Sequence, residues 1–387
     1  MTKKNKSSEL IRWSGILAGV FCLLILIVVF YQSYIYWNSL KNNSPGWIGR
    51  THREDSRLGY VPIPGTSGLM VLSGGSQVSV HYDSRGFRTD LENSSKTFCE
   101  LTSTRKFCLG LGCSFTFGFG IPGESTFCSL VADKLGMAPL NAGRCSYGLA
   151  EMLILAREII REFKPEIVLV QYSPWLVDRS QQRYGPTFHG LLPHPYFLEA
   201  RGDELVIHKP DFQSMIFDND LAKFRLSDHT FLDFVRFSIN IEIPLFFHDL
   251  WNAGLVRIKE LSGLSPSPWQ NSEKITRKVY AEIAAICKKH GAKMVLVVLG
   301  MDNTIPAVPE SLEKLNVKIV NAQLGLIERL KINSTEEYAN SYYHWAGDPP
   351  KVVDMHPNVG AHEIIAATIV DKHQHKQSLG IKNRGTE

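Results

Sequence analysis

Between residues 106 and 372, short apolar runs alternate with longer stretches in which apolar residues recur every three or four positions. Short runs that end at glycine, proline or polar residues are typical of buried parallel strands, and the longer stretches are typical of amphipathic helices. The expected strands are 107–111, 139–142, 167–170, 293–299 and 315–322. The expected helices are 124–135, 147–163, 272–290, 324–330 and 360–372. This order predicts an α/β domain, 106–375, with a parallel sheet.

The alternation stops over about residues 178–272, which are rich in histidine, proline and aromatic residues. Within this segment, residues 231–250 are mostly apolar but include Asp233 and Arg236, so they are too polar to span a bilayer. We interpret 178–272 as a helical insertion that caps the site. The simpler alternative is the ordinary packing of an amphipathic stripe.

The flanking segments are less regular. Residues 38–57 are polar and contain glycine and proline, which predicts a linker. Residues 58–105 include the alternating stretch Val78–Tyr82, and we expect a β-rich N-terminal embellishment packed on the main domain. Residues 376–387 are expected to be a polar tail.

Residues 1–37 combine a basic start with a long apolar run. The run from about 13 to 37 is long enough for a hydrocarbon core of about 30 Å, and aromatic residues stand at both of its ends. The basic residues before it favour a cytoplasmic N-terminus; they are Lys3, Lys4, Lys6 and Arg12. We therefore expect a single transmembrane anchor, with the remaining chain periplasmic or otherwise extracytoplasmic. A cleaved signal peptide is the alternative, but the run has no small-residue cleavage site.

Charge and cysteine content add limits to this interpretation. The net charge is +4 and the basic residues are scattered, so we expect no nucleic-acid partner. Seven cysteines match no zinc-binding spacing, and we expect neither a metal nor a cofactor. In an oxidising compartment Cys99 and Cys108 could form a disulfide, and buried free thiols are an equally good alternative.

Ser114 is the candidate nucleophile. It follows the apolar run 107–111 in the glycine-bounded stretch Gly112–Thr116, which places it at the carboxyl edge of the predicted sheet. The next helix would begin there, and its free N–H groups favour a developing negative charge. A serine hydroxyl is a weak nucleophile, so it needs a base within hydrogen-bonding distance.

The candidate base and acid are His356 and Asp354. They lie two residues apart, just before the last expected helix, and Pro357 keeps His356 out of helical geometry. A carboxylate so placed can orient the imidazole ring and stabilise the imidazolium. Other histidines are alternatives without a neighbouring aspartate in such a loop: His189, His194, His344 and His362.

Together these residues resemble the SGNH/GDSL hydrolase family. The stretch Gly112–Gly118 looks like the first block of that family, whose serine is the nucleophile. Asn141–Gly143, followed by Gly148, looks like the second block, whose glycine N–H contributes to the oxyanion hole. Asp354 to Asn358 looks like the last block, which supplies acid and base. The resemblance covers roughly 106–372, and it implies a flavodoxin-like three-layer fold and acyl-ester chemistry.

Two positions depart from the family pattern. Cys113 stands where the first block usually has aspartate. The third block usually supplies an asparagine as a side-chain oxyanion donor, but the corresponding stretch here, Gln171–Trp175, has none. Gln171 or Ser173 could donate instead. The backbone N–H groups of Ser114 and Gly143 do not depend on side-chain identity and are the expected oxyanion donors.

The resemblance implies a serine esterase, and the predicted N-terminal anchor places it at a membrane, acting outside the cytoplasm. Its substrate would be an acylated small molecule, lipid or carbohydrate. An O-acyltransferase of envelope carbohydrate is one alternative, because a sugar hydroxyl in place of water would accept the acyl group. A catalytically inactive binding or assembly protein on the same fold is the other, and the missing asparagine favours it.

Overall fold

The computed structural model describes some positions between 13 and 34, and residues 46–72, 75–94, 106–181, 184–187, 190–198, 205–210 and 268–382. The larger of its two compact units, Pro45–Phe224 with Pro266–Glu387, contains all the described strands. Residues 211–267, most of the predicted insertion, lie outside the described residues.

The predicted transmembrane segment is described only in part. Its described positions, from Trp13 to Tyr34, are helical, and their apolar side chains are largely exposed. Within the described part of the chain, no helix combines the length and the apolar character needed to cross a membrane. The membrane anchor thus stays a prediction.

A nine-stranded sheet forms the centre of the larger unit, in the order β1-β4-β5-β6-β8-β7-β9-β14-β15. Its last five strands are parallel to one another. They are β7 (Phe107–Leu111), β8 (Ala138–Asn141), β9 (Ile167–Tyr172), β14 (Lys293–Val298) and β15 (Lys318–Asn321). Taken in chain order their spatial sequence is 2-1-3-4-5, which is the flavodoxin-like arrangement. The predicted α/β fold with a largely parallel sheet is confirmed.

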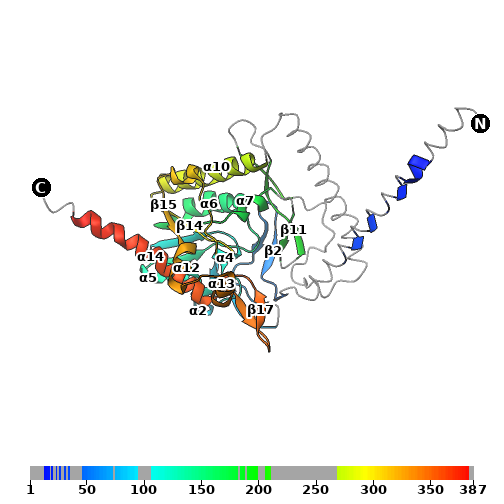
Figure 1. Ribbon diagram of the computed structural model, residues 1–387. Helices are drawn as coiled ribbons and strands as arrows, with labels where there is room; N and C mark the ends of the chain where they lie inside the picture. The colour runs from blue at the N-terminus through cyan, green and yellow to red at the C-terminus, as the bar shows by residue number, and fades with distance from the viewer. Residues whose placement is uncertain are drawn as a thin grey trace, which may run out of the picture. The chain divides into compact units, whose positions relative to one another are not determined.

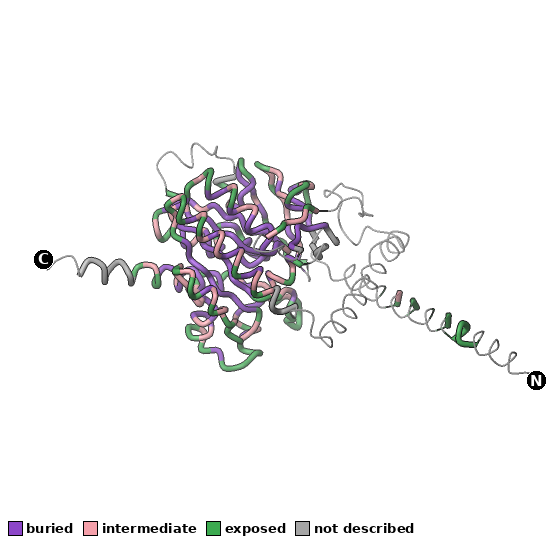
Figure 2. Tube along the Cα trace, turned by 90° about the horizontal axis from the view of Figure 1, so that it is seen from above, coloured by how far each residue is buried: buried purple, intermediate pink, exposed green. Residues whose placement is uncertain are grey.

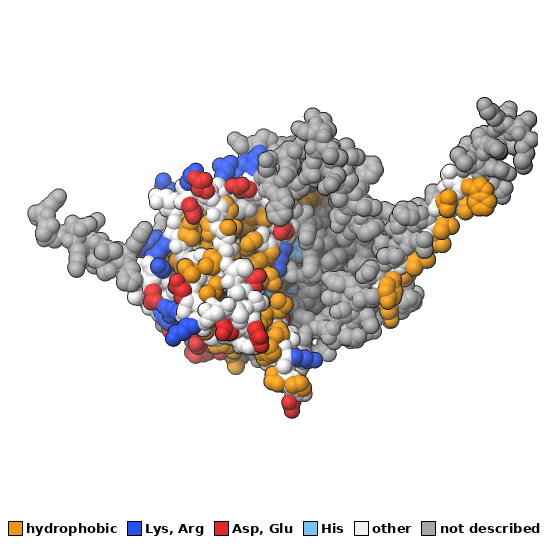
Figure 3. Space-filling model, in the orientation of Figure 1, with side chains coloured by type: hydrophobic (Ala, Val, Ile, Leu, Met, Phe, Trp, Pro, Cys, Tyr) orange, Lys and Arg blue, Asp and Glu red, His pale blue; other side chains and the backbone are white. Residues whose placement is uncertain are grey.

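Helices cover the sheet on both sides (Figure 1). On one side α6 (Leu149–Phe163) packs against α10 (Pro268–Lys289), and on the other α14 (Val359–Lys382) packs against α5 (Phe127–Lys134) and α12 (Ala322–Leu330). Every residue of β9 is buried between these layers, and Figure 2 shows the buried interior along the sheet. The shorter helices are α2 (Leu91–Ser94), η1 (Gly123–Ser125), α7 (Trp175–Arg179) and α11 (Glu310–Glu313). On the face seen in Figure 3, acidic, basic and apolar side chains are interspersed.

The N-terminal strands continue this sheet. Four antiparallel strands, β1 (Gly46–Ile48), β4 (Ser67–Val71), β5 (Gln77–Tyr82) and β6 (Arg88–Thr89), extend it beyond β8, and Arg88 pairs with Asn141. β2 (His52–Asp55) and β3 (Gly59–Pro62) form a separate hairpin. Residues 46–55, which we expected in a linker, are thus partly strand. Trp47 is buried and its indole donates a hydrogen bond to Thr51, which explains why this polar segment is ordered against the sheet.

Arg88 joins this extension to the candidate site. Its side chain is buried, lies over the ring of Phe117 at 4.4 Å, and donates a hydrogen bond to the carbonyl of Ile121 at 2.7 Å. Burial lowers its pKa to about 10. The guanidinium therefore holds the chain that follows the candidate nucleophile against β6.

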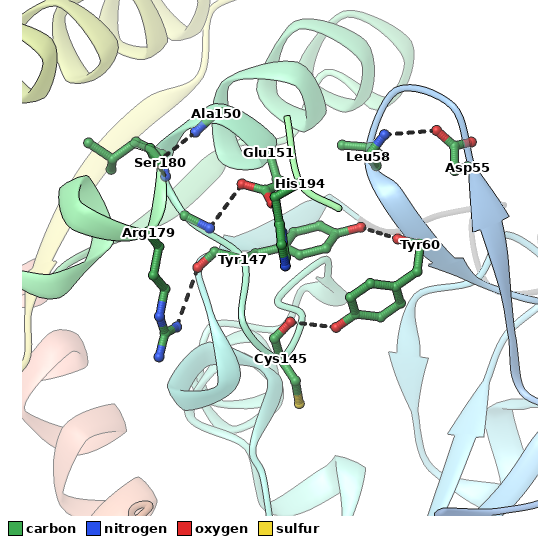
Figure 4. Close-up of polar contacts among 12 residues, drawn as sticks. Asp55, Leu58, Tyr60, Cys145, Tyr147, Ala150, Glu151, Arg179, Ser180 and His194 are labelled. Carbon is green, nitrogen blue, oxygen red and sulfur yellow. Dashed lines mark hydrogen bonds and ion pairs between the residues drawn. The ribbon is translucent and has the colours of Figure 1, made fainter. Parts of the chain in front are cut away.

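The first part of the predicted insertion contains strands. β10 (Tyr184–Thr187) pairs with β11 (Gly190–Pro193), and β12 (Tyr196–Leu198) pairs with β13 (Val206–His208). Between β11 and β12, His194 lies against the start of α6, where its Nδ1 is 2.5 Å from Glu151 Oε1 (Figure 4). Both side chains are buried, and the second oxygen of Glu151 accepts the N–H of Gly148 at 3.0 Å. This buried pair fastens the insertion to α6.

The described cysteines are free, buried thiols: Cys108, Cys113, Cys128, Cys145 and Cys287. Cys108, in the middle of β7, therefore forms no disulfide with Cys99, and the disulfide alternative is wrong. Its side chain points into the core between the sheet and α5, beside Cys128.

Stability should fall on acidification because of His362. This buried residue of α14 stacks on the ring of Phe127 at 5.6 Å and accepts the Phe127 N–H at 3.0 Å, and burial lowers its pKa to about 3. The unfolded chain binds a proton there near pH 6.5, so acidification below that pH favours unfolding, by up to about 1.4 kcal/mol per pH unit. Urea unfolding at several pH values should show a shallower pH dependence for His362→Leu than for wild type. The control His290→Gln, in the turn that follows α10, should keep the wild-type dependence; an unchanged slope in His362→Leu would contradict the assignment.

Candidate active site

The nucleophile turn lies where β7 ends. Ser114 is the first residue of α4 (Ser114–Phe117), and Cys113 before it is extended, with φ −92° and ψ −154°. A Cβ on Gly112 would lie 2.1 Å from Thr116 Oγ1, so only glycine fits between the strand and the helix. The helices expected from the sequence, the first of which begins at 124, did not include this short one. It places the Ser114 side chain at the carboxyl edge of the sheet, 4% exposed.

His356 and Asp354 reach the same edge from the other end of the domain. Helix α13 (Thr335–Tyr342) leads into a hairpin of β16 (His344–Ala346) and β17 (Lys351–Asp354), which the sequence did not predict. His356 Nε2 lies 2.8 Å from Ser114 Oγ, and His356 Nδ1 lies 2.6 Å from Asp354 Oδ1. The same oxygen accepts the backbone N–H of His356 at 2.8 Å. One continuous hydrogen-bond chain thus joins the three candidate residues.

Two phenylalanines that the sequence analysis did not single out hold the His356 ring. The ring of Phe119 lies 4.5 Å from it, and that of Phe115 lies 5.4 Å from it in an edge-on arrangement. Both follow Ser114 within five positions. The glycine- and phenylalanine-rich composition of this stretch was the signal that could have identified them.

Asn358 fixes the loop that carries His356. Its backbone N–H donates to the carbonyl of Tyr342 at 2.8 Å, and its side-chain oxygen accepts the N–H of Ala361 at 2.9 Å. The side-chain nitrogen donates to the carbonyl of Ser341 at 2.9 Å. Asn358 therefore connects α13 with the start of α14.

The two residues whose backbone N–H groups we expected at the oxyanion position both lie at α4: Ser114 begins it and Gly143 packs against it. The N–H of Ser114 belongs to the first turn of α4, where N–H groups have no partner within the helix. Gly143 packs directly on α4, since a Cβ on it would lie 2.5 Å from the nitrogen of Phe117. Its N–H donates to Asn141 Oδ1 at 3.1 Å. A substrate oxyanion would thus share this donor with the Asn141 side chain or displace it.

Gln171 and Ser173 brace the nucleophile turn. Gln171 Oε1 accepts the N–H of Cys113 at 3.0 Å and the hydroxyl of Thr116 at 2.9 Å. Gln171 Nε2 donates to Ser173 Oγ at 2.9 Å, and the Ser173 hydroxyl donates to the carbonyl of Leu299 at 2.9 Å. In this arrangement the donors of both side chains are directed to other protein groups. The oxyanion role that we considered for them stays a prediction.

Replacing Gln171 by leucine should destabilise the domain. The substitution leaves the buried N–H of Cys113 and the buried hydroxyl of Thr116 without their shared acceptor, and each unsatisfied group costs about 1–3 kcal/mol. Urea unfolding of Gln171→Leu should show a loss in that range or above it. Gln181→Leu, which changes an exposed glutamine bonded to Ser272, is the matched control and should change stability little. Equal stabilities of the two variants would show that the hydrogen bonds of Gln171 contribute nothing to the stability of the domain.

The alternative histidines occupy other environments. His362 accepts the Phe127 N–H, His194 pairs with Glu151, and His189 lies outside the residues whose side chains are described. In the described ranges, no group of three His, Cys, Asp or Glu side chains is arranged to hold a metal ion. A cavity of about 660 Å³ lies at the amino ends of β14 and β15, and its lining contains none of the candidate site residues.

Comparisons with known proteins give the following neighbours. No family model and no curated protein matches the sequence. Solved structures similar to this chain are GDSL-type lipases and esterases. They include the psychrotrophic esterase EstA from Pseudoalteromonas sp. (10% identity, TM-score 0.34, 70% of this chain and 99% of that one). A GDSL-like lipase from Bacteroides thetaiotaomicron has 11% identity and TM-score 0.31 over 70% and 89% of the chains. An acetylxylan esterase from Geobacillus stearothermophilus has 12% identity and TM-score 0.33 over 69% and 93%. At these values the likeness by itself says nothing about the reaction of this chain.

Proposed function

We propose that this chain is a serine esterase that hydrolyses acyl esters, with Ser114 as nucleophile, His356 as general base and Asp354 as the orienting acid. The observation that carries the proposal is the continuous hydrogen-bond chain from Ser114 Oγ through His356 to Asp354. Its lengths, 2.8 Å and 2.6 Å, are those required for proton transfer and for fixing the imidazole tautomer. This series of hydrogen bonds also favours a catalytic role over that of an inactive binding protein on the same fold.

In the first half of the reaction, Ser114 Oγ attacks the carbonyl carbon of the ester while its proton passes to His356 Nε2. Asp354 stabilises the imidazolium that forms. The carbonyl oxygen becomes an oxyanion that the N–H groups of Ser114 and Gly143 bind. Collapse of this intermediate breaks the bond to the alcohol, which takes the proton from His356 and leaves an acyl-Ser114 ester.

In the second half, water attacks the acyl carbon and gives its proton to His356 Nε2. The second oxyanion collapses, Ser114 Oγ leaves with that proton, and the carboxylic acid departs. A hydroxyl of a carbohydrate in place of water would make the same steps an O-acyl transfer, since only the acceptor differs. Product analysis with and without an added sugar acceptor separates these outcomes.

The predicted location belongs to the same proposal. The basic residues before the apolar run 13–37 favour a cytoplasmic N-terminus, so we place the catalytic unit outside the cytoplasm, tethered to the membrane. An alkaline phosphatase fusion after Glu387 should be active, and activity of only a cytoplasmic reporter at that position would refute this orientation.

Covalent labelling tests the chemistry without the natural ester. We expect a fluorophosphonate probe to label the full-length protein, purified in a mild detergent, at one site. Mass spectrometry should place the adduct on Ser114. His356→Ala, which removes the base, should label far more slowly. A wild-type protein that folds but does not react, or that reacts equally after loss of His356, would overturn the proposal.

A further inference from the structure

His344 occupies the space between the nucleophile turn and the loop that carries His356. It is the first residue of β16 and lies opposite Asp354 in the hairpin register. Its side chain is half-buried, and its Nε2 atom is fully enclosed without a well-aligned hydrogen-bond partner. The His344 ring therefore fills space between the two loops. It takes part in neither hydrogen bond of the Ser114–His356–Asp354 chain.

On one side the His344 ring packs on the backbone after α4. A Cβ on Gly120 would lie 2.8 Å from His344 Nε2, and Gly120 has φ +81°, so both its conformation and its neighbour require glycine. The ring also interacts with the backbone of Phe119 on this side, and with that of Pro357 on the other. His344 thus contacts the residue that follows His356 and the loop that follows Ser114.

The same loop contacts His356 directly. Phe119 meets His344 through its backbone and His356 through its ring, at 4.5 Å. Loss of the His344 ring would leave a space between Phe119 and Pro357, and both are in contact with or adjacent to the proposed base. Packed interiors close such spaces only partly, so the two loops would shift relative to each other.

We propose that His344 is a positioning residue that holds the Ser114 turn and the His356 loop at the separation that the 2.8 Å hydrogen bond requires. This inference rests on the proposed function. It concerns the distance between the two loops and leaves the chemistry to Ser114, His356 and Asp354.

The charges around His344 are consistent with a neutral ring. Burial lowers its pKa, the carboxylate of Asp354 opposes this change, and a charged His356 lowers the pKa further. His362, from α14, is also electrostatically coupled to it. A neutral His344 does not compete with the His356 imidazolium for the Asp354 charge during catalysis.

The test compares two substitutions at position 344 in the full-length protein, with p-nitrophenyl acetate as substrate. We expect His344→Ala to lower kcat by about 10- to 100-fold with little change in KM, because a misplacement of about 1 Å can cost as much as 100-fold. His344→Gln, which keeps a polar side chain that can reach the Phe119 and Pro357 backbones, should recover most of the loss. His373→Ala, in α14 beside the cavity at the amino ends of β14 and β15, is the matched control and should keep wild-type kcat.

A double-mutant cycle adds a readout that misfolding does not imitate. In the wild-type background, Gly120→Ala should displace the His344 ring and lower kcat. In the His344→Ala background, the same substitution should lower kcat by a smaller factor, because the ring that it displaces is already absent. Full additivity, or an unchanged kcat in His344→Ala, would overturn the positioning role. Fluorophosphonate labelling of wild-type Ser114 is measured first. An unreactive wild type refutes the proposed function. A reactive wild type, with variants at position 344 whose kcat is unchanged, refutes only the positioning role of His344.

Discussion

Ser114→Ala should lower kcat/KM for p-nitrophenyl acetate by at least about 10³-fold. If Ser114 has the proposed role, the substitution removes the atom that forms the acyl-enzyme, and what remains is the rate given by the oxyanion donors and binding. The Ser114 side chain is 4% exposed, and its hydroxyl lies 2.8 Å from His356 Nε2, so the methyl group of alanine fits the space without new contacts. Steady-state assays on the purified full-length protein measure the effect.

The matched control for this substitution is Ser125→Ala. Ser125 lies in η1, eleven positions further along the same loop region, and belongs to neither the hydrogen-bond chain nor the brace around Gln171. Its loss should leave kcat/KM within about twofold of wild type, because surface changes away from such features have small effects. Equal hydrolysis by wild type and Ser114→Ala would show that the observed turnover does not come from this site.

Asp354→Asn should lower kcat by about 10⁴-fold, the loss found when the aspartate of a Ser-His-Asp triad becomes asparagine. Asp354 Oδ1 accepts both the Nδ1–H and the backbone N–H of His356, so the carboxylate fixes ring and loop together. Asparagine has nearly the same shape but no negative charge. It would leave the imidazolium unstabilised in the transition state, so kcat should fall far more than KM rises.

Asp348→Asn provides the comparison for charge alone. Asp348 is an exposed carboxylate in the turn between β16 and β17, and removing its charge should leave kcat close to wild type. Thermal unfolding of both variants should show that the hairpin persists. A loss of less than tenfold in Asp354→Asn, with the protein folded, would mean that His356 is oriented by other contacts.

The parallel sheet and its helices were predictable because each element corresponds to a pattern of apolar residues within a short stretch of sequence. Each of the five parallel strands, β7, β8, β9, β14 and β15, lies on a short apolar run, and α6 and α10 show helical periodicity, so the order of these elements was predicted correctly. The β16–β17 hairpin was missed because its strands are short and partly exposed, and its turn is Gly347–Pro350. The connection of the N-terminal strands to the parallel sheet depends on the single pair Arg88–Asn141, which no local pattern encodes.

The candidate site was predictable to a similar extent. Ser114, Asp354 and His356 were identifiable because each lies at or just before the start of a helix at the carboxyl edge of the sheet, where side chains from distant segments meet. The bracing role of Gln171 was not, because it depends on contacts with a turn 58 positions away. Nor could the sequence show that Asn141 accepts the N–H of Gly143, since that bond depends on the conformation of the loop.

The buried pair of Glu151 and His194 has a consequence for engineering. Chimaeras that exchange the insertion of this chain for that of another would keep Glu151, because it belongs to α6, and would replace His194. A graft without a histidine at that position leaves a buried carboxylate that has lost its partner, an arrangement far more costly than the loss of an exposed contact. Glu151 also holds the N–H of Gly148, a few residues after Gly143. A chimaera should therefore exchange the insertion and residue 151 together, so that the buried pair comes from one parent.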